Sequence, residues 1–307
     1  MRILTFAFHG AYEYELSKTG NSFFRLSSNG IKPDDFGSRP FPENYRILSE
    51  NPRLGDYDLF LCDSPKRYWE VQRWDIPKVV TCHTHLTSKD KGMLKKIPQW
   101  VPKVFISHSN FQQSGLPLGM VIYHSIDTSV YSGYNGEKGS VLMVGNHVAD
   151  RGECNFKLFR RIVGELPFQI VGDNPELPSD KTFKAGDYEQ LKQAYREHRV
   201  YLNTVEAPVT MGMLEAMAGG MPVLSLNYGD VPEIVQNGRN GFCSGDWREL
   251  RENLIWLMNN PQEARRIGEA GRKTVEALFS PQVFTQRWNH VFDLAVTNYH
   301  WFMRRNK

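Results

Sequence analysis

The chain has 307 residues, of which 40% are apolar and 23% are charged, enough for two domains of about 150 residues with buried cores. This composition excludes a disordered, fibrous or collagenous chain. The 37 basic and 34 acidic residues give a net charge of +3, which is too small by itself to indicate a nucleic-acid-binding protein.

The four cysteines are widely spaced, without a CxxC pair, and no pair of histidines has the spacing of a zinc site. Neither a disulfide framework nor a structural metal is therefore indicated, and a reducing compartment fits best. The amino-terminal run MRILTFAFHG is too short for a secretory signal, and no run of 18 apolar residues occurs. We therefore expect a cytoplasmic protein.

Short apolar or β-branched runs recur at wide intervals and predict buried parallel strands. They cover residues 3–8, 59–62, 79–82, 104–106, 121–123, 141–144, 168–171, 200–203 and 223–226. Helical spacing separates the later runs, at residues 154–165, 188–197 and 214–218. This alternation predicts an α/β architecture of parallel sheets covered by helices. From Trp247 onward the pattern is helical, whereas residues 21–50 are expected to form a loop.

A polar, glycine-rich stretch after residue 125 predicts a boundary between two Rossmann-like domains, residues 1–125 and 126–307. The first domain carries 16 basic and 12 acidic residues, and the second carries 21 and 22. The basic surplus therefore belongs to the first domain.

The most informative stretch is residues 203–242, in which Thr210 is a candidate N-cap of a short helix. The first amides of such a helix point outward with the positive end of its dipole, which suits a diphosphate. These amides belong to Met211, Gly212 and Met213. Glu215, in the second turn, is expected to accept hydrogen bonds from the ribose of the same ligand.

The segments LEAMAGGMPVLSL (214–226) and GDVPEIVQNGRNGF (229–242) resemble the signature of retaining GT-B glycosyltransferases, specifically glycosyltransferase family 4. Weaker similarities are VVTCH, VIYHSIDTSVY, VLMVGN and QIVGDNP. The resemblance implies a GT-B fold, in which two Rossmann-like domains with parallel sheets face each other across a cleft. It also implies transfer of a hexose, with retention, from a nucleotide sugar on the second domain to an acceptor hydroxyl on the first. The acceptor would be a glycan, a lipid-linked molecule or another anionic molecule.

The donor-binding residues that the resemblance implies are Gly10, Gly145, Asn146, Arg151, Thr210, Met211, Gly212, Met213, Leu214 and Glu215. No metal or other cofactor is required in that family, because helix amides and a basic residue stabilise the diphosphate. A UDP-sugar is favoured over a GDP-sugar as the co-substrate. Asp173, Asn174 and the 182–183 region are expected near the base.

The resemblance implies His83 and Glu206 as the catalytic residues, with His83 positioning the donor sugar more than acting as a base. Two departures from the family pattern stand out. Asn146 occupies a position where the family usually has an Arg, so Arg151 is the remaining candidate cation. Glu206 lies one residue out of register with the family's first Glu, which would fall at Ala207.

The segment from Lys89 to Lys103 holds five lysines and one acidic residue, Asp90. Met93, Leu94, Ile97 and Trp100 lie between the lysines, at spacings that would give a helix one apolar and one basic side. We consider two interpretations: a solvated face, or peripheral contact with an anionic membrane or a polyanion.

The same sequence features raise three alternative functions. A non-catalytic nucleotide-sugar-binding scaffold of the same fold is compatible with Asn146 and the shifted Glu206. A glycosyltransferase that acts on modified DNA would use the same lysine-rich segment. A dinucleotide oxidoreductase is excluded, because no GxGxxG sequence follows a predicted strand.

Overall fold

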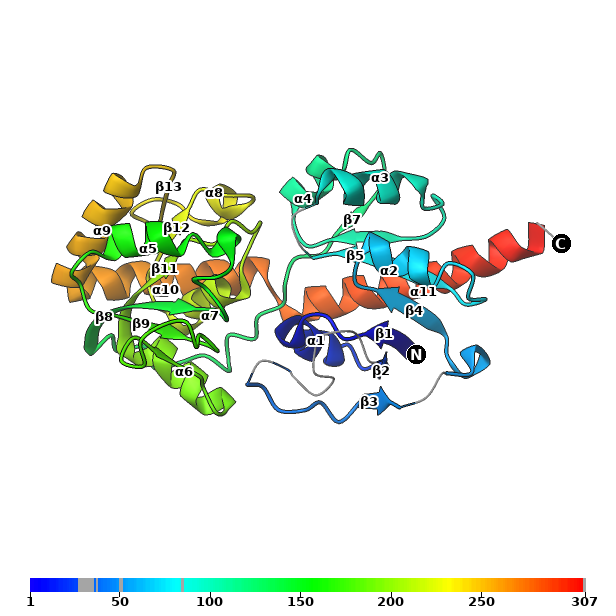
Figure 1. Ribbon diagram of the computed structural model, residues 1–307, viewed down its shortest axis with the longest axis horizontal. Helices are drawn as coiled ribbons and strands as arrows, with labels where there is room; N and C mark the ends of the chain where they lie inside the picture. The colour runs from blue at the N-terminus through cyan, green and yellow to red at the C-terminus, as the bar shows by residue number, and fades with distance from the viewer. Residues whose placement is uncertain (27–35, 37, 50–51, 84–85, 306–307) are drawn as a thin grey trace. The chain divides into compact units, whose positions relative to one another are not determined.

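The computed structural model describes residues 1–26, 36, 38–49, 52–83 and 86–305. The chain divides into two compact units, residues 1–125 with 281–307, and residues 126–280. The sequence placed residues 281–307 in the second domain, with helices crossing back to the first; in the structure they belong to the first unit. Each unit is built on one parallel sheet (Figure 1).

Over its described residues, the first unit has a seven-stranded sheet in the order β3-β2-β1-β4-β5-β6-β7, with all neighbours parallel. The strands are β1 (Arg2–Phe6), β2 (Ser22–Leu26), β3 (Tyr45–Leu48), β4 (Leu59–Cys62), β5 (Lys78–Cys82), β6 (Lys103–Phe105) and β7 (Met120–Val121). The helices are α1 (Gly10–Ser17), η1 (Leu54–Asp56), α2 (Pro65–Glu70), α3 (Ser88–Lys96), α4 (His108–Ser114) and α11 (Pro281–Arg305).

Helices cover both faces of the first sheet, so its central strands β4 and β5 are buried at every residue. On one face of this sheet, Phe60 of β4 and Val80 of β5 form a buried core together with Leu94 of α3. α11 packs against β4 and β5 and lies on the other side in Figure 1. Its Trp288 Nε1 donates to the hydroxyl of Tyr12 in α1 at 3.1 Å, which satisfies two buried polar groups.

The lysine-rich segment does not form a free amphipathic face. Leu94 and Ile97 are buried in the core, and the ring of Trp100 stacks on Phe302. Lys103 begins β6 and is buried, with its Nζ donating to the carbonyl oxygens of Pro98 and Val101 at 2.8 and 3.0 Å. The prediction of a basic surface extending to Lys103 is therefore wrong, and the basic side is confined to α3.

The first unit also buries an ion pair that the sequence pattern did not indicate. Glu13 of α1 and Arg25 of β2 are both fully buried, and Arg25 Nε donates to Glu13 Oε1 at 3.1 Å. A second contact joins Arg25 Nη2 to Glu13 Oε2. Removing one member would leave the other charge buried without its partner, so the pair ties α1 firmly to the sheet.

The second unit has a six-stranded parallel sheet in the order β10-β9-β8-β11-β12-β13, and all residues of this unit are described. The strands are β8 (Lys138–Val144), β9 (Phe168–Val171), β10 (Thr182–Phe183), β11 (His198–Asn203), β12 (Val223–Leu226) and β13 (Phe242–Ser244). The helices are η2 (Gly152–Cys154), α5 (Phe156–Val163), α6 (Tyr188–Glu197), α7 (Met211–Gly219), α8 (Val231–Ile234), α9 (Trp247–Asn259) and α10 (Pro261–Leu278).

Alternate residues of the central strands build the core of the second unit. Val141 and Met143 of β8 and Leu202 of β11 belong to one buried cluster with side chains of α5 and α9. α6 and α7 pack against the sheet as well, and α10 packs against α7 and α9. Each strand run therefore has helices to bury its apolar side chains, as a parallel sheet requires.

The nine strands predicted from apolar runs are all present; three of them (59–62, 168–171 and 223–226) have the predicted ends, and the other six have shifted ends. The prediction that residues 21–50 form a loop is wrong in part, because β2 and β3 lie there; residues 27–35, 37 and 50 lie outside the described part. Ring stacking of Phe23 on Tyr45, with centroids 4.9 Å apart, accompanies the pairing of these two strands. Among the described helices, none is long and apolar enough to cross a membrane.

We predict that Glu13→Gln lowers the free energy of unfolding of the first unit by about 3–5 kcal/mol, because the Arg25 guanidinium stays buried without a carboxylate. Urea denaturation followed by tryptophan fluorescence measures this change. Glu70→Gln is the matched control, since Glu70 pairs with Arg67 at 2.7 Å on a more exposed surface and should cost less than about 1 kcal/mol. Equal effects of the two variants would contradict the role of the buried pair.

Candidate functional site

The predicted donor residues of the second unit gather at one edge of its sheet. β8, β9, β11 and β12 are parallel, so their carboxyl ends meet at that edge. Residues 145–155 follow β8, residues 172–181 follow β9, and residues 204–210 follow β11. Ligands of open α/β sheets bind at this edge, outside the carboxyl ends of the strands.

α7 begins at this edge, and its N-cap is Thr210, as the sequence predicted. The hydroxyl Oγ1 of Thr210 accepts a hydrogen bond from the Met213 amide at 3.3 Å and lies 3.3 Å from Oδ1 of Asn203, the last residue of β11. The first amides of an α-helix have no partner within the helix. Met213 is capped by Thr210, whereas the amides of Met211 and Gly212, in the first turn, have no acceptor within the helix.

Gly212 is needed for packing below the helix. A Cβ atom at this position would lie 2.5 Å from the hydroxyl oxygen of Tyr201 in β11. This packing requirement was not predicted from the sequence, and the contact of the Gly212 amide with a donor stays a prediction. Any side chain here would push the first turn of α7 away from β11.

Glu215 is buried instead of lying on an open surface, with 3% of the residue exposed. Its Oε2 accepts a hydrogen bond from the hydroxyl of Tyr195 in α6 at 2.8 Å. Burial, together with the Glu215 carboxylate, raises the pKa of Tyr195 well above its usual value, so the hydroxyl keeps its proton and donates. The carboxylate thus has a partner inside the protein, and its contact with a ribose stays a prediction.

The far end of α7 is held by a cation. Arg272 of α10 donates through Nη1 to the carbonyl oxygens of Ala218 and Tyr131, and through Nη2 to that of Thr128 at 2.8 Å. A positive charge at the carboxyl end of a helix is favourable because it opposes the negative end of the dipole. The helix is therefore fixed at both ends.

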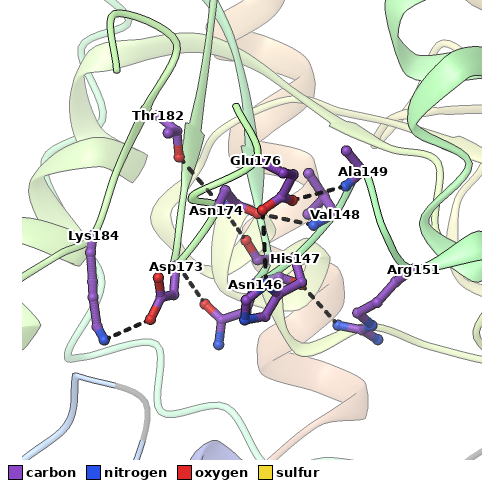
Figure 2. Close-up of polar contacts among 11 residues, drawn as sticks. Asn146, His147, Val148, Ala149, Arg151, Asp173, Asn174, Glu176, Thr182 and Lys184 are labelled. Carbon is purple, nitrogen blue, oxygen red and sulfur yellow. Dashed lines mark hydrogen bonds and ion pairs between the residues drawn. The ribbon is translucent and has the colours of Figure 1, made fainter. Parts of the chain in front are cut away.

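The loop after β8 is braced by side chains from the loop after β9 (Figure 2). Asn174 is buried, donates to the Gly145 carbonyl at 2.9 Å, and accepts from the Val148 amide at 2.9 Å. Asn146 accepts from the Asp173 amide at 2.8 Å. The amide group of Asn174 thus holds the loop that carries Asn146, and its position near a base stays a prediction.

Gly172 makes this brace sterically feasible. Its φ is +147°, and a Cβ atom there would lie 2.1 Å from the carbonyl oxygen of Gly145. Only glycine fits such a distance to the backbone. Gly145 and Gly172, which end β8 and β9, thus bring the two loops into contact.

Arg151 is exposed and stands at the mouth of the loop, where its guanidinium pairs with Glu153 at 2.9 Å. Its Nη1 also points to the Asn146 carbonyl at 3.4 Å, as Figure 2 shows. A backbone hydrogen bond and Arg151 lower the pKa of Glu153, so the pair is charged at neutral pH. An incoming phosphate would therefore compete with Glu153 for Arg151.

Glu206 is exposed in the loop between β11 and α7. Its Oε1 accepts from Nδ2 of Asn155 at 3.0 Å, and its amide donates to the Glu153 carbonyl at 2.8 Å. These two hydrogen bonds join the 204–210 loop to the 151–155 turn. We call these two segments, which carry Glu206 and Arg151, the rim of the site.

Three potential metal ligands lie beside this rim, although the sequence predicted none. One donor atom from each of His147, Asp150 and Glu176 lies within 4.8 Å of the others. His147 Nδ1 and Glu176 Oε2 are 3.8 Å apart, while Glu176 Oε1 accepts from the Ala149 amide at 3.2 Å. His147 and Asp150 are exposed, and exposed groups of this kind often occur without a metal ion.

The candidates of the first unit gather at the carboxyl ends of β1 and β5. His83 follows β5, its ring centroid lies 4.2 Å from that of Tyr12, and its Nε2 is 3.3 Å from Oγ1 of Thr81. Gly10 is the first residue of α1, whose N-cap His9 accepts from the Tyr12 amide at 3.2 Å. Burial, followed by the nearby His9 and His124, lowers the pKa of His83 well below its ordinary value.

Several supporting residues escaped the sequence analysis. Asn155, Tyr195 and Arg272 act through partners that are distant along the chain, and no local pattern marks them. Asn174 was named as a neighbour of the base, but its role in holding the loop after β8 was not predicted.

Comparison with solved structures identifies the fold. Among solved structures, Anabaena HepE in complex with UDP-glucose superimposes with a TM-score of 0.74 at 16% identity, over 95% of this chain and 99% of that chain. The sucrose-phosphate synthase from Thermosynechococcus elongatus gives a TM-score of 0.73 at 15% identity, over 95% and 98%. With its two Rossmann-like parallel sheets, the protein has the GT-B fold.

Residues 139–260 match the family described as glycosyl transferases group 1. Sulfoquinovosyl transferase SQD2 of Arabidopsis thaliana is 29% identical over 195 residues, 56% of this chain and 36% of that protein. N-acetyl-alpha-D-glucosaminyl L-malate synthase of Bacillus anthracis is 25% identical over 151 residues, 44% and 39%. The matches therefore span less than half the length of these relatives. The match to this family covers 122 of the 307 residues, all of them in the second unit.

We predict that His83 makes the first unit less stable in mild acid. The unfolded chain takes up a proton near pH 6.5, whereas the folded imidazole stays neutral, so the free energy of unfolding falls as pH drops below 6.5. Between pH 7.5 and 5.5 the loss due to His83 should reach up to about 1.4 kcal/mol. Urea denaturation at both pH values measures it.

His83→Asn should remove this part of the pH dependence, and His290→Asn, which changes an exposed histidine of α11, should not. If both variants kept the full pH dependence of the wild type, the lowered pKa of His83 would be refuted.

Proposed function

We propose that the protein is a hexosyltransferase that takes its sugar from a nucleoside-diphosphate donor, with UDP favoured as the carrier. The observation that carries this proposal is the amino end of α7, whose Met211 and Gly212 amides lie at the carboxyl edge of the second sheet. Such an end binds phosphate groups through its amides and its dipole. The similarity to HepE in complex with UDP-glucose supports uridine as the base.

Arg151 supplies the side-chain cation in this proposal. A phosphate that binds at the rim would displace Glu153 from the guanidinium and gain a charge-assisted, bidentate contact. The α7 amides and Arg151 together would stabilise the negative charge that develops on the leaving diphosphate, so the reaction would need no metal ion. Glu206, on the same rim, would contact the hydroxyls of the donor sugar.

We further propose that transfer retains the anomeric configuration, with the departing phosphate accepting the proton of the acceptor hydroxyl. His83 suits a positioning role, because its lowered pKa keeps the imidazole neutral near pH 7. Its ring is oriented by Tyr12 and Phe8, with centroids at 4.2 and 4.9 Å. The acceptor stays open, since the relatives' names specify different products.

A nucleotide-sugar-binding protein without turnover is the second candidate. It is favoured by the ion pair that occupies Arg151 and by Asn146 in place of a second cation. Release of UDP from UDP-glucose in the presence of candidate acceptors separates the two functions. Sustained release supports the transferase, and tight binding with no release for any acceptor supports the binding protein.

We predict that Arg151→Ala weakens UDP binding about tenfold, the size of one lost charge-assisted hydrogen bond. Glu153→Gln should strengthen binding, because it frees Arg151 from its carboxylate partner. Isothermal titration calorimetry measures both affinities.

Arg248→Ala is the control, since Arg248 is an exposed arginine of the same unit that pairs with Asp246 at 3.6 Å. Unchanged UDP affinity in Arg151→Ala would eliminate this residue as the phosphate cation, whereas the α7 amides would still account for any binding that persists.

A further inference from the structure

The first unit contains a pocket that the proposed transferase activity does not use. Its volume is about 400 Å³, within the range of small-molecule sites. It is bounded by the segment that joins α3 to β6, the segment that joins α4 to β7, and α11. The lining residues are Lys95, Ile97, Gln99, Val101, Pro102, Lys103, Gly115, Leu116, Pro117, Leu118, Gly119, Met120, Leu294 and Asn298.

The pocket lies at the opposite end of the first sheet from His83. Lys103 and Met120 are the first residues of β6 and β7, so the pocket is at the amino ends of these strands. His83 instead follows the carboxyl end of β5. Since reacting ligands of open α/β sheets bind at carboxyl ends, a molecule in this pocket would be neither donor nor acceptor.

The lining is mostly aliphatic, which excludes a sugar or a nucleotide as its natural occupant. Ile97 and Val101 are buried and form part of the pocket wall. Leu118, by contrast, is 67% exposed, which is the highest value among the large apolar side chains of the described residues. The exposed Leu118 extends the apolar surface of the pocket outward, and a hydrocarbon group placed there would remove both from water.

Charge at the pocket is of one sign. None of its lining residues is acidic, and two are lysines. Lys103 Nζ donates hydrogen bonds to the carbonyl oxygens of Pro98 and Val101. Lys95 is exposed, and its Nζ lies beside Gly115: a Cβ atom added to Gly115 would be 3.9 Å from it. Asp90, the acidic residue of α3, is used by the capping box with Thr87.

We propose that this pocket binds one hydrocarbon chain of an anionic amphiphile, with the phosphate or carboxylate head on Lys95 and the chain against Leu118. The volume suits a single chain, and the lysine suits a negative head. The proposed anion site is therefore the single residue Lys95 beside an apolar pocket, in place of the basic surface over Lys89–Lys103 that the sequence predicted. The inference does not depend on the proposed transferase function.

Decyl phosphate, below the concentration at which it forms micelles, is the probe. Calorimetry should show saturable binding to one site, absent with inorganic phosphate. Hexyl phosphate should bind far more weakly, since each methylene that leaves the apolar site lowers the affinity about fourfold. Equal affinity for the hexyl and decyl compounds, or no saturable binding, would overturn the proposal.

Two exposed positions provide variants that should fold. Lys95→Ala is expected to weaken decyl phosphate binding about tenfold, whereas Lys96→Ala, which changes the neighbouring exposed lysine outside the lining, should not. Leu118→Ser should weaken it as well, and Leu278→Ser, at an exposed leucine of the second unit, should not. Equal effects of Lys95→Ala and Lys96→Ala would show general charge attraction and refute the site.

Binding to lipid vesicles then shows whether the hydrocarbon chain belongs to a membrane lipid or to a soluble amphiphile. Sedimentation with vesicles of phosphatidylcholine containing phosphatidylglycerol, and loss of that sedimentation in Lys95→Ala, would support a lipid of an anionic bilayer as the occupant. Binding of decyl phosphate without binding to these vesicles would support a soluble amphiphile in the same pocket.

Discussion

The position of α7 is the constraint on which the candidate donor site depends. This helix is buried along almost its whole length, so its orientation is set by packing on all sides. Thr210 fastens its amino end to Asn203 of β11, Glu215 joins its middle to Tyr195 of α6, and Arg272 holds the carbonyl of Ala218 at its far end. An anion-binding helix end must not move when the ligand arrives, because binding free energy would otherwise be lost to ordering it.

The loops at the carboxyl edge of the second sheet are built in the same way as α7: buried groups hold the backbone, and exposed groups would face the ligand. Asn174 and Gly172 bring the loops after β8 and β9 together. Arg151 and Glu206, which carry the charges, stand exposed on that frame. Rigid elements therefore position the site, while the charged side chains stay free to exchange one partner for another.

Much of the fold could be predicted from local pattern, because buried parallel strands are apolar throughout and α7 carries its own cap and glycine signals. What could not be predicted depends on distant partners. β2 is short and contains a charged residue, Arg25, which is buried only because Glu13 of α1 meets it. Lys103 looks like a surface charge until the carbonyls of Pro98 and Val101 surround it. Glu215 looks like a surface carboxylate until α6 brings Tyr195 to it. In each case a polar group is buried by a contact that no local spacing reveals.

The central claim is that the α7 edge binds a nucleoside diphosphate by amides and Arg151, without a metal ion. Its most direct test is a calorimetric titration of the wild-type protein with UDP, GDP, ADP and TDP, first in EDTA and then with magnesium or manganese. We expect saturable binding in EDTA, with UDP preferred and its affinity unchanged by the metals. Binding that appears only with a metal ion would contradict it and would direct attention to His147, Asp150 and Glu176.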